Sequence, residues 1–371
     1  MDFELSEERQ MLKDTADRFL RDQYTIEKRH AATGGDEGFD RAMWAELCEL
    51  GLPSALVDPE AGGFGGAGED IALIFEALGR GLVVEPFLPT LCATMVLAQH
   101  KTEMVESVIE GGTLVAWAHV EPDAYYTPSY VATKVNADGT LTGAKAVVIN
   151  GGTADWLVVT ARSAGEVADE KGLGLFLVDT KADGVEITSH KSIDGPHVAE
   201  VKLTNAAAEP LGEPGTGWPL IEKTLAAGTL AVSAEAIGAM EVAKDMTLEY
   251  LKERKQFGKP IGGNQVLQHR MVDMLLELEQ ARSAVMLAAN SFEADRDLRE
   301  KNVSAAKNLV GRAGRLIAEE TIQMHGGIAM TWEYAGPHYA KRIIMIDHLF
   351  GDTDHHLDRF IQIGRAMDAA G

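Results

Sequence analysis

The sequence of 371 residues, 46% hydrophobic and 25% charged, has the composition of a globular protein with two or three domains. Its 57 acidic and 34 basic residues give a formal net charge of −23, and no basic run is long enough to predict a nucleic-acid-binding surface. No stretch of about 18 uninterrupted apolar residues occurs, so we predict no membrane span.

The N-terminal residues and the cysteines point to a reducing compartment. Residues 1–9 are acidic and lack the basic-then-apolar order of a signal peptide. The chain has only two cysteines, Cys48 and Cys92, too few for a disulfide scaffold or a zinc cluster. We therefore expect a cytoplasmic protein without a metal site.

The first third of the chain is predicted to be helical. Ser6 can cap a helix whose first turn carries Glu7 and Glu8, where negative charge meets the positive end of the helix dipole. Apolar residues recur at helical spacing over 41–50 and 70–81, and a further helix is expected from about 88 to 110. These elements define an N-terminal helical domain over residues 1–112.

Between residues 113 and 210, short β-rich runs replace the helical pattern. Asp138-Gly139 and Asp183-Gly184 mark turns between them. Closely spaced strands with no helix between them predict a small antiparallel barrel or sandwich. The strands are expected over 114–120, 130–135, 146–149, 156–161, 173–178, 184–188 and 200–203.

The segment 211–371 is predicted to be helical again, after a Gly- and Pro-rich connector. We interpret the methionines of its strongest helix as core packing against other long helices. The apolar face of that helix carries Leu267, Met271, Met274, Leu275, Leu278 and Val285. The order of helices, strands and helices predicts an α+β fold.

Two further motifs do not predict a ligand-binding site. Residues 63–68 match G-x-G-x-x-G, but no strand precedes them, so we interpret their glycines as a tight turn between helices. His355 and His356 are adjacent and would diverge by about 100° on a helix, so they cannot hold one metal ion together. We expect them to be solvated or interfacial.

Two segments of the last third carry residues suited to phosphate binding. Residues 254–258, Arg-Lys-Gln-Phe-Gly, end a predicted helix, and an arginine there can clamp a diphosphate. Residues 323–327, Gln-Met-His-Gly-Gly, place paired glycines after another helix, where backbone N–H groups can approach an anion closely.

Together with motifs elsewhere, these segments make the chain resemble the acyl-CoA dehydrogenase family. The resemblance runs through residues 59–66, Glu121-Pro122, Asp155-Trp156, 254–258, 265–274, 323–327 and 351–353. It implies the fold of that family: an N-terminal helical domain, a middle antiparallel β-barrel and a C-terminal four-helix bundle.

The resemblance also implies FAD chemistry. In this family a glutamate removes the α proton of an acyl-CoA thioester, and the β hydrogen leaves as hydride to the flavin. The FAD lies across a subunit interface. By position, Trp156 and Thr353 would lie near a flavin ring. The residues that would bind the diphosphate and adenine side of a neighbour's FAD are Arg254, Gln256, Phe257, Gln323, Gly326 and Gly327.

The sequence departs from the family at the catalytic base. Gly351 stands in place of the usual glutamate, and Thr229 stands at the family's alternative base position. Asp352 is one residue away and shorter than glutamate, and Glu222 and Glu235 are six or seven residues from Thr229. The family's flavin- and thioester-contacting segment, Thr-Glu-Pro-x-x-Gly-Ser-Asp, is here Val-Glu-Pro-Asp-Ala-Tyr-Tyr-Thr at residues 120–127.

This pattern predicts a subunit of a heteromeric enzyme, in which a second acyl-CoA dehydrogenase-like chain supplies the base and the ring pocket. The chain resembles the small subunit of pimeloyl-CoA dehydrogenase and subunits of the α2β2 heterotetramers that act on steroid side-chain CoA esters. The resemblance implies an electron-transfer flavoprotein as electron acceptor. Two alternatives stay open: a homotetramer with Asp352 as base, and a flavin-free scaffold of the same fold.

Overall fold

The computed structural model describes residues 5–370, which fold into two compact units. The first unit comprises residues 1–26, 67–83 and 229–371, and the second comprises residues 27–66 and 84–228. Each unit is therefore assembled from segments that are distant in the sequence.

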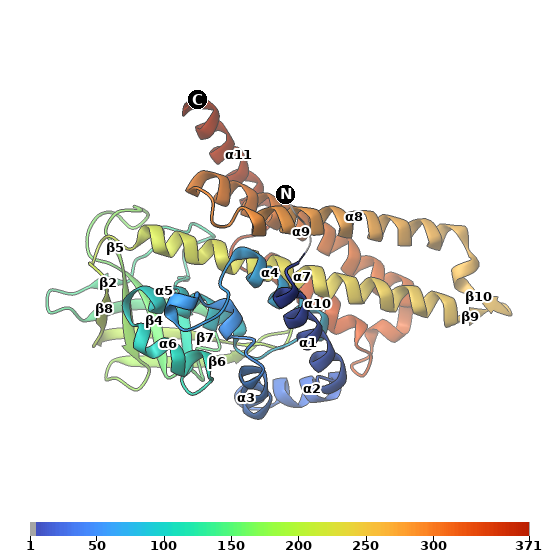
Figure 1. Ribbon diagram of the computed structural model, residues 1–371, viewed down its shortest axis with the longest axis horizontal. Helices are drawn as coiled ribbons and strands as arrows, with labels where there is room; N and C mark the ends of the chain where they lie inside the picture. Colours follow the sequence, from blue (N-terminus) through green and yellow to red (C-terminus); the bar gives the residue numbers. More distant parts are fainter. Residues whose placement is uncertain (1–4, 371) are drawn as a thin grey trace. The chain divides into compact units, whose positions relative to one another are not determined.

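The first unit is helical (Figure 1). Helix α9 contacts α8, α10 and α11, and helix α4 contacts α1 and α8. A short hairpin, β9 (Lys255–Gln256) with β10 (Lys259–Pro260), extends beyond the ends of α7 and α8. The helices are α1 (Glu7–Gln23), α4 (Gly68–Gly81), α7 (Trp218–Glu253) from residue 229 onward, α8 (Gln265–Asn290), α9 (Arg296–His325), α10 (Gly336–Asp347) and α11 (Thr353–Ala370).

Helices α4 and α7 pack closely because glycines face the partner backbone. A Cβ at Gly79 would collide with the carbonyl oxygen of Glu235, and a Cβ at Gly238 would collide with that of Glu76. Ser6 caps α1 by accepting the backbone N–H of Arg9, which confirms the predicted start of that helix.

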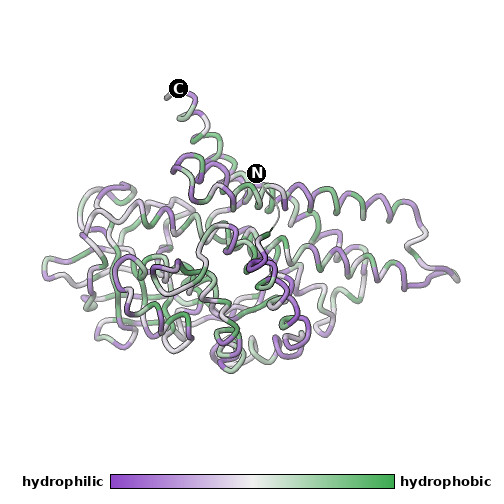
Figure 2. Tube along the Cα trace, viewed as in Figure 1, coloured by the Kyte–Doolittle hydropathy of each residue, from purple (hydrophilic) through white to green (hydrophobic). Residues whose placement is uncertain are grey.

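Helix α8 carries apolar residues on its exposed side as well as on its buried side. Of the predicted apolar face, Met274, Leu278 and Val285 are buried, whereas Leu275 is 43% exposed. Hydrophobic and hydrophilic residues alternate along this helix (Figure 2). The exposed apolar residues form a stripe of Val266, Val272, Leu275, Leu276, Met286 and Leu287. Exposed apolar surface of this kind marks a site where another protein can pack.

The second unit combines short helices with a β-sheet. The helix expected over 88–110 is two helices, because the backbone leaves the helical conformation at Lys101, with φ −145° and ψ 52°. The helices are α2 (Ile26–Gly34), α3 (Arg41–Glu49), α5 (Phe87–His100) and α6 (Thr102–Ile109). The strands are β1 (Val115–Ala118), β2 (Lys134–Val135), β3 (Leu141–Ile149), β4 (Trp156–Arg162), β5 (Leu173–Asp179), β6 (Val185–Lys191), β7 (His197–Ala206) and β8 (Glu209–Leu211).

The strands form one sheet in the order β6-β7-β3-β2-β4-β5-β8, with β1 paired to β4. Most pairs are antiparallel, but β1 and β2 both run parallel to β4, which corrects the expectation of a purely antiparallel domain. The long connection from β1 to β4 makes parallel pairing possible. The core of the sheet includes Leu141, Val148, Leu157, Val159, Phe176, Val178, Val201 and Leu203.

A buried ion pair ties the segment after β1 to the sheet. The fully buried ammonium of Lys145 donates to Glu121 Oε1 at 2.7 Å and to the hydroxyl of Thr160 at 3.1 Å. Glu121 also accepts the backbone N–H groups of Ala132 and Thr133. Burial lowers the pKa of Lys145 to about 8, and the charge of Glu121 acts in the opposite direction.

Helix α7 is long and apolar enough to cross a membrane by length and composition, the one such helix among residues 5–370. Its most apolar window has a mean hydropathy of 1.3, and 83% of that window is buried. Core helices pass the same test, and this burial indicates that α7 is a core helix.

We predict that Glu121→Gln destabilises the protein by about 3–5 kcal/mol, because it leaves the Lys145 ammonium buried without its counter-charge. Urea unfolding followed by circular dichroism measures this loss. The matched control is Glu186→Gln, which removes an exposed pair with Lys202 and should cost less than about 1 kcal/mol. Equal losses in the two variants would contradict the assigned role of the buried pair.

Buried His119 should make the protein less stable as the pH falls. His119 is buried against Trp117, and burial lowers its pKa to about 3. Between pH 6.5 and about 3 the unfolded chain binds a proton that the native state does not, so His119 makes stability fall as pH falls. Replacement by Asn should flatten this slope, whereas His190→Asn, at an exposed site, should leave it unchanged.

Candidate functional site

The two predicted phosphate-binding segments, residues 254–258 and 323–327, lie beside one cluster of aromatic rings in the first unit. The rings of Tyr250, in the last turn of α7, and His325, at the end of α9, have centroids 4.6 Å apart. The hydroxyl of Tyr334 is 2.7 Å from Nε2 of His325. Arg254 follows Tyr250 by one helical turn, and Gly326 follows His325 directly. The fold therefore brings the two segments to the same end of the bundle.

The hairpin after α7 presents its side chains to solvent. Arg254, Gln256 and Phe257 are all exposed, and the ring of Phe257 is fully so. Phe257 and Gly258 have φ values of 52° and 79°, the left-handed pair that a two-residue hairpin turn requires. A non-glycine residue in this conformation costs about 1–2 kcal/mol. An aromatic ring held there in water favours a role in contact with another molecule.

The glycine pair after α9 leaves its backbone open. Gly326 has φ 65° and ψ −137°, a conformation essentially limited to glycine. Nothing lies within 4 Å of the Cβ position at Gly326 or Gly327, and Gln323 is exposed one turn earlier. A ligand can therefore approach this backbone without meeting a side chain of the first unit at those positions.

The position that the family resemblance assigns to the base, Gly351, is unfavourable for a side chain. Gly351 has φ 107°, which disfavours every residue except glycine. A Cβ built there would collide with the ring of His355 and would lie 3.0 Å from Nε2 of His356. A glutamate could not occupy this position unless the histidines moved.

The buried ammonium of Lys307 and the buried imidazole of His356 fix the backbone at that position. Lys307 of α9 donates to the carbonyl oxygens of Asp347 at 2.8 Å and Gly351 at 2.6 Å, and burial lowers its pKa to about 8. Nε2 of His356 is 3.0 Å from the carbonyl oxygen of Phe350. The expectation of a solvated His356 is therefore wrong, because the ring is buried as a backbone partner.

The remaining acidic candidate caps a helix. Asp352 Oδ1 accepts the backbone N–H of His355 at 2.9 Å, in the first turn of α11. The hydroxyl of the neighbouring Thr353 donates to Asp347 Oδ1 at 2.8 Å and lies where a side chain at Gly311 would collide with it. Both side chains thus have structural partners within the first unit.

The alternative base position lies in a buried stretch of α7. Thr229 is 3% exposed, and its carbonyl oxygen accepts the hydroxyl of Ser233. Glu235 is held by Arg342 through two bonds of 2.6 and 2.8 Å. Glu222 is also buried. Threonine cannot act as a base, and the paired carboxylate of Glu235 is already committed to a cation.

The second unit holds the β-domain positions singled out by the sequence. Trp156 is half-buried at the start of β4, where it pairs with Val115 and Asp179. Tyr125 and Tyr126 have φ values of 43° and 67° and stand in the segment that differs from the family. Their rings are exposed rather than packed in the core.

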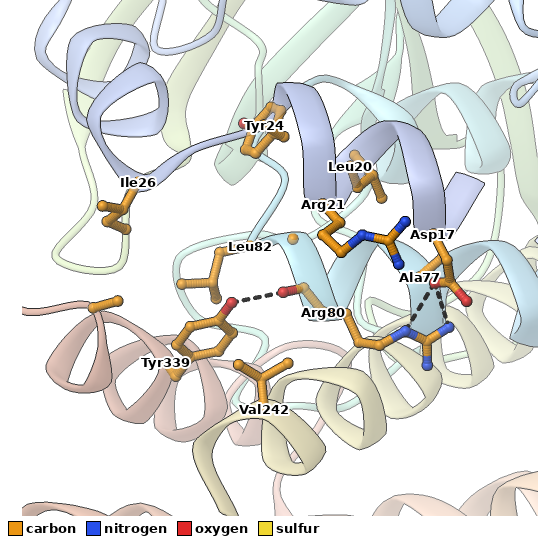
Figure 3. A pocket seen from close by; sticks show the side chains of 12 residues that line it. Asp17, Leu20, Arg21, Tyr24, Ile26, Ala77, Arg80, Leu82, Val242 and Tyr339 are labelled. Carbon is orange, nitrogen blue, oxygen red and sulfur yellow. Dashed lines mark hydrogen bonds and ion pairs between the residues drawn. The ribbon is translucent and has the colours of Figure 1, made fainter. Parts of the chain in front are cut away.

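A pocket of about 450 Å³ lies within the first unit, between side chains of α1, α4, α7 and α10 (Figure 3). The hydroxyl of Tyr339 donates to the carbonyl oxygen of Arg80 in its wall, and Arg80 pairs with Asp17. The predicted site residues do not line this pocket. In the described part of the chain, no group of three His, Cys, Asp or Glu side chains could hold a metal ion.

Sequence reasoning missed Lys307, although a signal existed. Val303, Val310 and Ile317 are buried on α9 at helical spacing, and Lys307 falls on the same stripe. A lysine among such positions is buried only where acceptors meet its ammonium. Its partners are backbone carbonyls, which no residue pattern identifies.

Comparison with known proteins covers nearly the whole chain. Three family models match it, described as the N-terminal, middle and C-terminal domains of acyl-CoA dehydrogenase, over residues 6–106, 116–206 and 215–363. A relative from Mycolicibacterium smegmatis, "Acyl-CoA dehydrogenase IpdE2", is 30% identical over 364 residues, or 96% of this chain and 98% of the relative.

Two solved structures extend the comparison. A variant of the "Tcur3481-Tcur3483 steroid ACAD" shares 27% identity and a TM-score of 0.87, covering 98% of this chain and 99% of the other. The "ChsE4-ChsE5 complex from Mycobacterium tuberculosis" has the same fold, with 24% identity, a TM-score of 0.88 and 99% coverage of both chains. The expected helical, β-sheet and helical domains are thus confirmed. The chain belongs to the acyl-CoA dehydrogenase family, whose members are oxidoreductases that act on CH–CH bonds.

Proposed function

We propose that this chain is the base-deficient subunit of a heteromeric acyl-CoA dehydrogenase, which introduces an α,β double bond into an acyl-CoA thioester. The observation that carries the proposal is the position of Gly351, where the left-handed backbone and the His355 ring leave no room for a glutamate. A second chain of the same family, with a glutamate at one of the two base positions, would remove the α proton.

The proposal assigns to this chain the diphosphate and adenine side of a FAD whose ring lies on the partner. The guanidinium of Arg254 suits a diphosphate, and the open backbone of Gly326 and Gly327 allows its close approach. The exposed ring of Phe257 suits the adenine. When bound, FAD supplies the acceptor for the hydride that leaves the acyl chain.

The apolar stripe on α8 supports assembly with a second subunit. Val272, Leu275 and Leu276 are each more than 40% exposed, and burial of such a stripe stabilises association. Similarity to the steroid ACAD structure favours a steroid side-chain or comparable CoA ester as substrate. We further propose an electron-transfer flavoprotein as electron acceptor and a cytoplasmic location. The resemblance to pimeloyl-CoA dehydrogenase stays a prediction.

Production of the chain alone and together with a glutamate-bearing companion tests the assembly. We expect the lone chain to lack turnover and the pair to be yellow and active. Full FAD occupancy and turnover by the lone chain would overturn the proposal. A colourless, inactive pair would instead favour the flavin-free scaffold.

Arg254→Ala should weaken FAD retention by the assembled enzyme roughly ten- to hundred-fold, because it removes a charge-assisted phosphate contact. Flavin absorbance after dialysis measures the effect. The control is Arg315→Ala, which removes another exposed arginine, one that pairs with Glu319 on α9. Equal flavin content in the two variants would argue against the contact.

Asp352→Asn separates the proposal from the homotetramer in which Asp352 is the base. Asparagine caps a helix as well as aspartate does, so the start of α11 should keep its stability. We expect an unchanged turnover rate. A loss of about 10²–10⁴-fold, the scale of a missing general base, would favour the alternative.

A further inference from the structure

Residues 326–334 form a largely exposed loop that begins with the 3-10 helix η4 (Gly326–Met330), in which Ala329 is buried, and returns to the end of α9. Met330 and Trp332 are exposed within it. Besides the backbone hydrogen bonds of η4, Thr331 donates through its N–H and its hydroxyl to the carbonyl of Ile328. After η4, Nε2 of His338 lies 2.8 Å from the carbonyl oxygen of Trp332. A further contact, at residue 334, anchors the end of the loop to α9.

The anchor is the hydrogen bond between Tyr334 and His325, 2.7 Å long. Nδ1 of His325 lies 2.7 Å from the carbonyl oxygen of Thr321 and so carries the ring proton, which leaves Nε2 to accept the Tyr334 hydroxyl. The His325 ring is 3% exposed and packs against Tyr250 of α7. The residues that flank the loop are thus joined through a buried imidazole of fixed orientation.

We propose that His325 and Tyr334 are positioning residues that close this loop and thereby present the Gly326–Gly327 backbone to the nucleotide. This inference rests on the proposed function, in which that backbone approaches the diphosphate. His325 and Tyr334 do not touch the ligand in this role. They fix the glycine conformation before binding, which lowers the entropy that binding must otherwise remove.

In the neutral His325, with the ring proton on Nδ1, the Tyr334 hydroxyl is the donor of this hydrogen bond. Burial lowers the pKa of this imidazole, while the carbonyls of Thr321 and Met246 act in the opposite direction. The rings of Tyr250 and Tyr334 face the His325 ring, and the negative charge of Glu253 acts on the Tyr334 hydroxyl. A protonated His325 donates from both nitrogens, and the Tyr334 hydroxyl, which can also accept, keeps the contact with its direction reversed. The contact between Tyr334 and His325 is therefore available in both protonation states of His325.

The test compares Tyr334→Phe with Tyr339→Phe in the assembled, FAD-containing enzyme. Tyr339 also donates a buried hydroxyl to a carbonyl, that of Arg80, but lies outside the loop (Figure 3). Flavin fluorescence after dilution gives the FAD release rate. We expect Tyr334→Phe to release FAD about five-fold faster, the scale of one hydrogen bond. Tyr339→Phe should behave as the unaltered enzyme does.

Amide hydrogen exchange supplies a readout that does not depend on flavin. In Tyr334→Phe the amides of 326–334 should exchange faster, while those of α9 before residue 321 should not change. An unaltered release rate in Tyr334→Phe, in an enzyme that holds FAD, would overturn the positioning role alone. An assembled enzyme without FAD would overturn the proposed function and the positioning role with it.

Discussion

The backbone between α10 and α11 is the constraint on which this account depends. Lys307 and His356 are buried and can stay so only because carbonyl oxygens of Asp347, Gly351 and Phe350 meet their polar atoms. Those contacts hold Phe350 and Gly351 in consecutive left-handed conformations, with φ 59° and 107°. The family resemblance places the catalytic glutamate of other members at the position of Gly351. In this chain the carbonyl groups of the loop are hydrogen-bonded within the chain. The His355 ring occupies the space that a glutamate side chain would need.

The other end of the bundle is organised in the opposite way. The half-buried ring of Tyr250 and the buried ring of His325 support a surface whose outer residues, Arg254 and Gly327 among them, are exposed. The supporting groups have partners within the chain, whereas the outer groups face solvent. A rigid support beneath an open surface is the arrangement that favours ligand binding, because little order is lost when the ligand arrives. The two ends of the bundle therefore match the proposed function, in which this chain holds the nucleotide and a companion supplies the base.

The hydrophobic period and the turn residues predicted the order of helical, β-rich and helical segments, because they act locally, and the motifs predicted the family. The sequence failed where tertiary contacts decide. The break at Lys101 and the parallel pairing of β1 with β4 depend on packing between distant segments. Leu275 follows helical spacing but lies on the exposed side of α8. The sequence identified Gly351 as the departure from the family, yet only the fold places the His355 ring in the space of the missing side chain.

The most direct measurement is a structure of the flavin-loaded assembly of this chain with a glutamate-bearing companion. The account predicts the FAD diphosphate beside Arg254 and Gly326 of this chain, with the flavin ring and the only carboxylate near the substrate α carbon on the companion. A flavin ring bound among copies of this chain alone, with an oxygen of Asp352 or another of its carboxylates over the substrate, would contradict the account.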